Sequence, residues 1–532
     1  MKNKIFKITV LSLLLAFAGM ATYGCQELET VNVNSPDEAR ALQNPEDVEA
    51  LIAGAYFSWF TAVFNGNPIE SLETSADVLS YSWGNFGSRE LSSEPRAAIP
   101  NQTSWRYRAF VNTPWFGLYG AISSANDGLR AIDGGLEIEE LARARAFAKF
   151  NQGISHAMLA ILFDQAFIFD ETIDLETADL QLSDYNAVFA AAKTQLEEAI
   201  SIMESNSFTL PGTWIIGTSY SSAELAQLTH TLLAKFMTMV PRDAAARSAV
   251  NWNEVLSHID RGITEDFVMI DQEAEWWNSL PWYHSRASST TWGRGDYKMI
   301  GPSDRSSGYQ DWLSTPTSAR DDFEMDTADL RIWDQTRDDS GNQNPGLYYD
   351  NRGAARFPPD RGTYHHSMYS NHRWPDYQAS SGNGPMTIIL AVEMDFLRAE
   401  ALLHTGGSLQ EVVDIINATR VVNGGLEAAD VSDGAGSMSD TRAALKPASL
   451  WGMLKYEKAI ETTLTFVATQ FCDARGWGDL TGGTFTQLPI PAQELETLQL
   501  ATYTFGGSGP GSAPKQHKDR VRLHSSEASG VH

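Results

Sequence analysis

The chain has 532 residues, more than a single hydrophobic core usually serves, so it holds either several domains or a helical repeat whose units pack against their neighbours. Hydrophobic residues make up 42% and charged residues 20%, as in ordinary globular proteins, and a formal net charge of −28 argues against a nucleic-acid partner because such a surface repels phosphate groups. Two cysteines cannot build a disulfide framework, whereas 15 Trp residues offer flat faces on which sugar rings can stack.

The N-terminal segment has the features of a lipoprotein signal peptide. Three lysines precede an apolar run over 8–18, which is too short to span a bilayer as a helix. Gly24 and Cys25 follow, and a small residue before a cysteine at this place resembles a lipobox, although Thr22 stands where the common pattern has Leu. We therefore expect residues 1–24 to be removed and Cys25 to be acylated as the only membrane attachment, since no other stretch is long and apolar enough to span a bilayer.

An ordinary signal peptide with a chance cysteine is the alternative interpretation of this segment. Glu27 and Glu29 follow the cysteine closely. Acidic residues at that place resemble the surface-export signal of Bacteroidetes-type lipoproteins, which predicts a position at the cell surface.

Apolar residues recur at helical spacing in nine segments of the chain. Alanines dot several of these segments, and closely crossing antiparallel helices need such small side chains. The patterns predict a mainly α fold in which helix pairs of a tetratricopeptide-like type stack into a scaffold. The expected helices are 45–62, 114–132, 138–163, 184–203, 222–240, 252–263, 387–404, 408–422 and 450–471.

Three other stretches lack a regular period. Residues 65–112 are rich in Gly, Ser, Pro and Asn, which predicts loops. Residues 267–385 form a longer irregular insert, and we expect it to be functional because its many Trp and Tyr residues argue against disorder. The composition of 506–532 predicts a disordered tail, which leaves 25–505 as the folded body.

Four stretches, in order along the chain, resemble the SusD/RagB family of surface lipoproteins. Lys458 stands where that family usually has Arg, and the spacing from Glu461 to Trp477 is longer than usual. The stretches are 34–56, 115–126, 396–426 and 457–495, and they include Trp115-Phe116-Gly117-Leu118-Tyr119, Phe396-Leu397-Arg398-Ala399-Glu400-Ala401, Ile416-Asn417-Ala418-Thr419-Arg420, Glu457-Lys458, Trp477-Gly478-Asp479-Leu480 and Leu488-Pro489-Ile490-Pro491.

The resemblance implies a fold and a function. The family has a tetratricopeptide-like helical scaffold with a large loop-rich region, which implies a SusD-like binding domain over 25–505. Its members are non-catalytic proteins, lipid-anchored to the outer membrane at the cell surface, that need no cofactor. They bind oligosaccharides, or in some branches peptides, and pass them to a SusC-like TonB-dependent transporter. The resemblance thus implies nutrient uptake with a transporter as partner, while its motifs carry fold information and not ligand contacts.

The densest aromatic cluster lies in the irregular insert. Sugar binding needs aromatic faces for the rings and polar groups for the hydroxyls, and Glu273, Glu275, Arg286 and Asp296 lie near this cluster in the sequence. The alternative is that the aromatics pin a long loop to the scaffold, because large aromatic side chains are usually mostly buried. The expected ligand-binding residues of the cluster are Trp276, Trp277, Trp282, Tyr283 and Trp292.

Two further aromatic groups are candidates for the ligand site. Trp83, with Tyr81 and Asn85, lies in the early loop region, and residues 348–350 and 364–374 form the third group. By contrast, two aromatic residues on a predicted helix are expected in the core, namely Trp115 and Tyr119.

Sequence motifs for metal binding or catalysis do not stand out. His365, His366 and His372 match no standard zinc spacing, and the acidic run 321–329 lacks the central Gly and terminal Glu of a calcium loop. Two alternatives to a binding protein stay open. One is a surface glycoside hydrolase or lyase on a helical scaffold, whose carboxylates would converge only in space, and the other is a helical-repeat adaptor that binds proteins.

Overall fold

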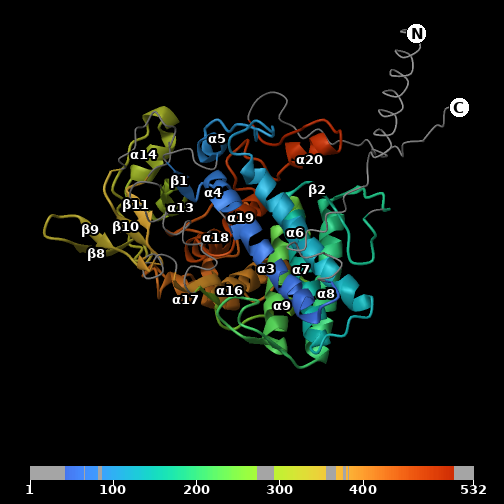
Figure 1. Ribbon diagram of the computed structural model, residues 1–532. Helices are drawn as coiled ribbons and strands as arrows, with labels where there is room; N and C mark the ends of the chain where they lie inside the picture. Colours follow the sequence, from blue (N-terminus) through green and yellow to red (C-terminus); the bar gives the residue numbers. More distant parts are fainter. Residues whose placement is uncertain are drawn as a thin grey trace, which may run out of the picture.

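The computed structural model describes residues 42–64, 66–81, 87–175, 177–271, 293–354, 367–374, 379–380 and 383–507. The predicted signal peptide, Cys25 and residues 508–532 of the predicted tail lie outside the described residues. Within the described ranges helices dominate and the strands are short (Figure 1). The predicted mainly α fold is therefore confirmed.

Helices build the scaffold, and the longest of them lie side by side in the right half of Figure 1. The scaffold helices are α3 (Pro45–Phe64), α6 (Ala109–Asp133), α7 (Leu141–Leu162), α8 (Tyr185–Ser205), α9 (Ser222–Met239), α11 (Trp252–Ile259), α16 (Ala391–Thr405), α17 (Leu409–Arg420), α18 (Leu450–Glu461) and α19 (Thr469–Trp477). Helix α7 packs along α6 and α8, and α3 crosses both α6 and α7. The late helices join this group through α11, which contacts α9 and α16.

The helix ends fall at residues that suit them. The Asp184 side chain accepts hydrogen bonds from two backbone N–H groups at the start of α8, as its sequence position predicts. Ser221 and Glu224 form a reciprocal capping box at the start of α9. Helix α16 ends at Gly406, whose φ of 69° is a left-handed conformation that costs glycine little.

The prediction of one helix over 450–471 is wrong, because a turn separates α18 from α19. The backbone is left-handed at Leu464 and Ala468, with φ of 63° and 60°. The hydroxyl groups of Thr462 and Thr463 donate to carbonyl groups four residues earlier, at 2.7 and 2.6 Å. Such local bonds, together with the stiffness of β-branched side chains, weaken a helix at this point, although the apolar spacing runs on through it.

Two other predicted boundaries are also wrong. The expected helix 387–404 overlaps strand β12 (Gly384–Ile389), which pairs with β6 (Phe267–Asp271), so α16 begins only at Ala391. The stretch expected to be loops, 65–112, contains two short helices. These are α4 (Gly66–Ser75) and α5 (Ser88–Ser92).

The described strands form six antiparallel ribbons of two strands each. Besides β6 and β12, the pairs are β1 (Leu79–Tyr81) with β7 (Gly293–Gly295), β2 (Gln165–Phe167) with β3 (Leu182–Asp184), β4 (Thr209–Leu210) with β5 (Tyr220–Ser221), β8 (Trp333–Arg337) with β9 (Gln343–Pro345), and β10 (Tyr349–Asn351) with β11 (Tyr369–Asn371). Ribbons from the irregular insert gather beside the scaffold, at the left of Figure 1, with α13 (Tyr297–Ile300) and α14 (Gly308–Ser314).

Aromatic side chains fill much of the core. Trp115 is 1% exposed and meets Phe163 edge-on at 4.9 Å between ring centroids. The hydroxyl of Tyr119 accepts a 2.6 Å hydrogen bond from the backbone N–H of Phe167. The predicted core positions of Trp115 and Tyr119 are therefore confirmed. In the part of the chain that the structure describes, no helix is both long and apolar enough to cross a membrane.

Buried charges join the late helices to the rest of the molecule. Arg247, on α10 (Ala244–Ser248), binds both carboxylate oxygens of Glu400 on α16, with Nε and Nη2 at 2.8 and 2.7 Å. Asp473 on α19 accepts from Arg247 at 3.1 Å and from Lys458 at 2.8 Å. Glu400 and Lys458 belong to the motifs that resemble the SusD/RagB family, so those motifs contribute to the buried ion pairs of the scaffold.

A second buried group joins the insert to α18. The Arg331 guanidinium, from the insert, donates to Glu457 at 2.6 Å and to Glu461 at 2.9 Å. Tyr348 donates its hydroxyl to Glu461 at 2.6 Å. Arg331 and Glu457 are fully buried and Glu461 is nearly so, which fixes the described part of the insert firmly to the scaffold.

Candidate functional site

The aromatic residues predicted to bind ligand lie outside the described residues. This applies to Trp276, Trp277, Trp282, Tyr283 and Trp292 in the insert, to Trp83 with Asn85 in the early loop, and to Glu273, Glu275 and Arg286. Their role in binding stays a prediction.

The strands that flank two of these segments are neighbours. Tyr81 is the last described residue before 82–86, Gly293 is the first after 272–292, and the two are paired partners in the β1–β7 ribbon. Strand β7 is also tied to β11, since Ser367 donates its hydroxyl to the Gly295 carbonyl at 2.7 Å. The described residues that precede 82–86 and follow 272–292 are therefore neighbours in the fold.

Several described residues among the other candidates are buried or bonded within the fold. Tyr349 is fully buried and Tyr348 is 8% exposed, so neither ring offers a face for stacking. Asp296 is 1% exposed, accepts from the Ser80 hydroxyl at 2.8 Å and caps α13. His372 makes a 2.8 Å bond to the Gly346 carbonyl, while His365 and His366 lie outside the described residues. No group of three or more potential ligands for a metal ion occurs among the described residues.

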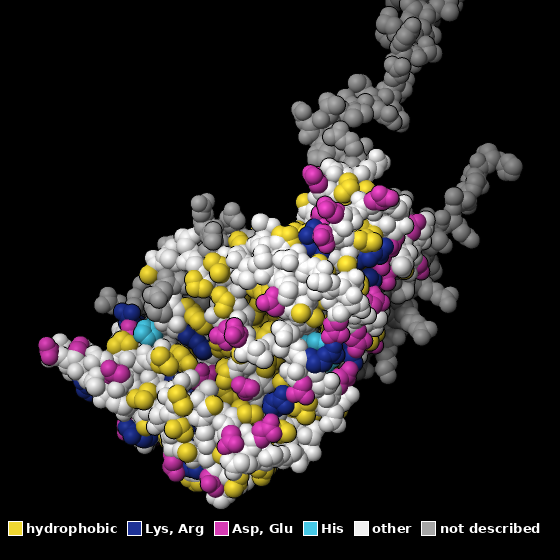
Figure 2. Space-filling view, turned by 90° about the horizontal axis from the view of Figure 1, so that it is seen from below, with side chains coloured by type: hydrophobic (Ala, Val, Ile, Leu, Met, Phe, Trp, Pro, Cys, Tyr) yellow, Lys and Arg dark blue, Asp and Glu magenta, His cyan; other side chains and the backbone are white. Residues whose placement is uncertain are grey.

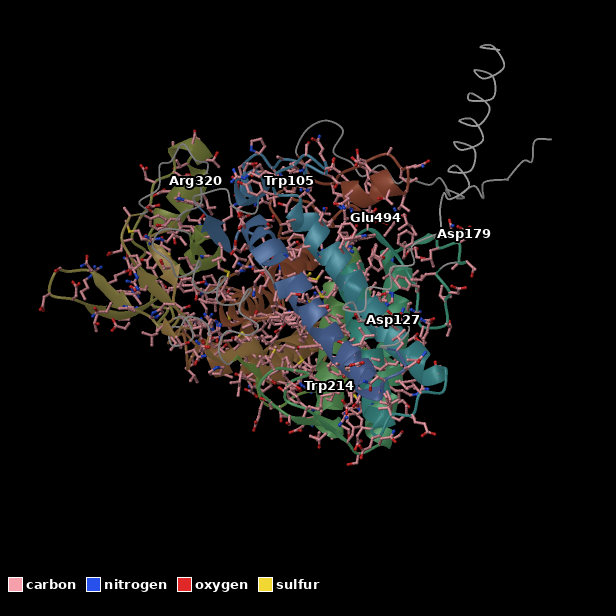
Figure 3. All side chains as sticks on the ribbon, in the orientation of Figure 1. Trp105, Asp127, Asp179, Trp214, Arg320 and Glu494 are labelled. Atoms are coloured by element: carbon pink, nitrogen blue, oxygen red, sulfur yellow. The ribbon has the colours of Figure 1, made fainter. Side chains whose placement is uncertain are left out.

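A pocket lies where α6 begins beside α20 (Ala492–Thr497). It is a shallow depression of the surface, and its volume of about 200 Å³ includes space that is open to solvent. Figure 3 shows Trp105 and Glu494 at the same end of the molecule, the end at which these two helices meet. The lining residues are Pro100, Asn101, Gln102, Thr103, Trp105, Arg108, Val111, Asn112, Ala492 and Gln493.

Asn101 holds the two walls of this pocket together. Its Nδ2 donates to the carbonyl groups of Ile490 and Tyr503, each at 2.9 Å, and its Oδ1 accepts from the Ala492 N–H at 2.9 Å. The amide side chain is 8% exposed. One residue of the early loop thus fixes the segment that leads into α20, about 390 positions later in the sequence.

Trp105 supplies the aromatic wall. It is half-buried, and its ring lies near Tyr107 and Phe110, at 6.1 and 6.5 Å between centroids. A Cβ atom at Gly87 would lie 2.9 Å from Trp105 Cζ2, and Gly87 has a left-handed φ of 79°, so only glycine permits this close approach. Gly87 directly follows residues 82–86, which links the pocket along the chain to the segment that contains Trp83.

Polar side chains make up most of the remaining lining. Asn112 donates to Gln493 Oε1 at 3.1 Å across the gap between α6 and α20. Thr103 donates to Glu496 Oε1 at 3.1 Å at the rim. The lining offers an aromatic face, amides, a hydroxyl and one guanidinium, a set that can hold a polyhydroxylated ring. Among the described residues that line it there is no carboxylate, histidine or cysteine that could act as acid, base or nucleophile.

Sequence reasoning missed this pocket. Trp105 is the single aromatic residue in a polar stretch, Gln102 to Arg106, that precedes a helix. Such a position is only a weak indication that the ring is exposed. The second wall could not be anticipated, because nothing in the spacing of Trp105 and Gln493 reveals that they meet.

Several solved structures resemble this chain. A SusD superfamily protein from Bacteroides fragilis has a TM-score of 0.54 and 13% sequence identity, over 86% of this chain and 99% of its own. A SusD superfamily protein from Bacteroides vulgatus gives 0.53 and 14%, over 86% and 97%. A SusD-like carbohydrate binding protein from Bacteroides fragilis gives 0.51 and 13%, over 89% and 90%. No protein-family model and no curated protein matches the sequence.

Proposed function

We propose, from the premise that this chain has the SusD fold, that it is a nutrient-binding lipoprotein that holds oligosaccharides at the cell surface without changing them. The shared fold over most of the chain supports the class of protein, and one of the similar structures is a carbohydrate binding protein. The observation that carries the proposal is the pocket of Trp105, in which a half-buried indole lies beside amides and a hydroxyl.

The remaining parts of the proposal rest on the sequence. Cys25 would carry the lipid that holds the protein to the outer membrane, and residues 25–505 would form the binding domain. The bound sugar would pass to a SusC-like TonB-dependent transporter. The aromatic residues 276, 277, 282, 283 and 292, with Trp83, would extend the contact with a longer oligosaccharide beyond the pocket.

Isothermal titration of the chain from residue 26 onward, against plant, algal and microbial oligosaccharides and peptides, tests the proposal. Chromatography of the same mixtures shows whether the ligand is cut. We expect heat of binding, intact ligand, and a loss of affinity in Trp105→Ala. Phe116→Ala is the control, because Phe116 is 40% exposed on α6 and lies outside the pocket lining.

Each result has a clear meaning. Shortened products would show that the protein is a hydrolase or lyase and not a binding protein. Binding that Trp105→Ala leaves unchanged, but that Trp276→Ala or Trp282→Ala removes, would move the site to the insert. Binding of peptides alone would contradict the sugar ligand.

The anchor is tested on the full chain in a bacterial host that processes lipoproteins. The wild type should partition into detergent and carry lipid on Cys25 by mass spectrometry, whereas Cys25→Ala should stay in the aqueous phase. Cleavage at another position without lipid would show an ordinary signal peptide.

A further inference from the structure

We infer that the Trp105 pocket selects acidic oligosaccharides, in which a sugar ring stacked on the indole carries a carboxylate that the Arg108 guanidinium binds. This inference rests on the proposed function, since it names the class of sugar that the same pocket takes. It follows from one charged side chain in the lining, Arg108, which has no ion-pair partner among the described residues.

Arg108 is a cation without a counter-charge in a strongly acidic protein. It is exposed, its Nη1 donates to the Trp105 carbonyl at 3.4 Å, and no carboxylate of the described residues forms an ion pair with it. Arg106, two residues earlier, is also exposed and without an ion pair, and it lies 5.4 Å from the Tyr107 ring centroid. One guanidinium without an ion pair therefore belongs to the pocket lining, and a second lies two residues away along the chain.

Basic side chains elsewhere in the described structure are mostly neutralised. Exposed examples are Arg305, paired with Asp326 at 2.5 Å, and Arg337, paired with Glu324 at 2.6 Å. On the face that Figure 2 shows, acidic side chains are spread among the apolar ones, and most Lys and Arg side chains adjoin them. With a net charge of −28, an arginine that keeps its positive charge free in a pocket marks a place where an anion is favoured.

The chemistry of Arg108 suits a carboxylate. A guanidinium presents parallel N–H groups that match the two oxygens of a carboxylate, so one such pair adds both affinity and orientation. The bond from Arg108 to the Trp105 backbone holds the cation beside the aromatic wall. A ring that stacks on the indole would thus place a carboxylate substituent near the guanidinium, while Asn112 and Gln493 serve its hydroxyl groups.

Glu496 sharpens the test because it opposes an anion. Its carboxylate accepts from Thr103, which lines the pocket, so it is the negative charge that the described contacts join to the rim. Removing this charge should favour an acidic sugar, and removing the charge of Arg108 should disfavour it. The quantity that tests the inference is the difference in affinity between an acidic sugar and its neutral form, because Arg108 lines the pocket for both.

The experiment compares acidic oligosaccharides with their own neutral forms, by isothermal titration of the chain from residue 26 onward. The probes are oligomers of galacturonic acid, of mannuronic and guluronic acid, and of glucuronic acid-bearing xylan, each beside its methyl ester. We expect at least one acid form to bind about tenfold tighter than its ester at low salt. The preference should shrink as the salt concentration rises, because ions screen an exposed charge pair.

The variants locate the preference. Arg108→Gln should abolish the difference in affinity between acid and ester, whereas Glu496→Gln should enlarge the difference. Arg145→Gln is the matched control: Arg145 pairs with Asp133 at the other end of α6, about 35 Å along the helix axis, and its loss changes the net charge equally. A similar effect of Arg145→Gln would show that only the overall charge acts.

Two failures are distinct. The inference is wrong if no acid form binds tighter than its ester, or if the preference for the acid survives Arg108→Gln. In either case, binding of esters or neutral sugars would still support the proposed function. If no sugar of any kind binds, the proposed function itself fails.

Discussion

The guanidinium of Arg247 and the carboxylate of Glu400 form a two-pronged ion pair in which both side chains are fully buried. Glu400 also accepts from Trp477 Nε1 at 2.9 Å. Burial disfavours the charge of Glu400, but Arg247 and Lys458 outweigh it and lower the pKa of the carboxyl to about 2. The pair connects α10, α16 and α19, whose packing closes the late part of the scaffold.

Glu400→Gln should lower the free energy of unfolding by about 3 kcal/mol, because the buried guanidinium then keeps only Asp473 as a charged partner. Urea unfolding at pH 7 measures this loss. Asp133→Asn, which breaks the exposed pair with Arg145, is the control and should cost at most about 0.5 kcal/mol. Equal losses in the two variants would show that burial does not set the strength of the pair.

The buried carboxyl of Glu73 predicts that the stability of the protein falls as the pH rises. Burial, and next the charge of Asp473, raise its pKa from 4.5 to about 8. Between these values the folded protein holds a proton that the unfolded chain has released, so stability falls as the pH rises from about 4.5 to about 8. Glu73→Gln cannot ionise and should be more stable than the wild type by about 2–4 kcal/mol at pH 8, with no difference at pH 4. Urea unfolding at pH 4, 6 and 8 checks this, and a difference that stays constant over that range would contradict it.

Asn101→Ala should damage the fold and the pocket together. It removes three hydrogen bonds from a nearly buried amide, which predicts a loss of about 2–3 kcal/mol in unfolding free energy. Amide exchange should rise in 98–105 and in 488–503, and sugar binding should weaken. Asn206→Ala is the control, since its exposed amide makes only a local bond to Ile202. Faster exchange over the whole protein would show a global effect instead of a local one.

Two glycines with open space around them should respond to alanine in opposite directions. Gly406 ends α16 with a left-handed φ of 69°, so Gly406→Ala should cost about 1 kcal/mol in backbone strain. Gly54 lies inside α3 in a helical conformation, so Gly54→Ala should stabilise the protein by about 0.5–1 kcal/mol. Thermal unfolding of both variants measures the two signs, and a shift of both in the same direction would contradict the argument.

The sequence predicted those features that depend on local pattern. Apolar periodicity predicted the long scaffold helices. Apolar periodicity does not predict the break between α18 and α19, because the apolar stripe through Ile460 and Phe471 continues across it. The break depends on threonine side chains that bond to the backbone and weaken the helix. Strand β12 was also missed, since its pairing with β6 joins residues more than a hundred positions apart.

The candidate site was harder to predict than the fold. The density of aromatic residues predicted a ligand site at Trp276 and its neighbours, which lie outside the described residues. Tyr348 and Tyr349, in another predicted group, are buried. The pocket of Trp105 depends on a contact between the early loop and α20 that leaves no trace in local composition. The resemblance identifies Glu400 and Lys458 as motif residues but does not reveal their physical role. That role depends on Arg247 and Asp473, which bind them in the folded protein.

The distance along the chain between the two walls of the pocket sets the order in which it can form. Trp105 belongs to the first fifth of the polypeptide, and Gln493 to its last tenth. A chain that is synthesised from its N-terminus therefore has no complete pocket until almost all of it has emerged. Products that stop before Ile490 would lack a partner of Asn101 as well as the second wall. The pocket is thus confined to molecules whose synthesis is essentially finished.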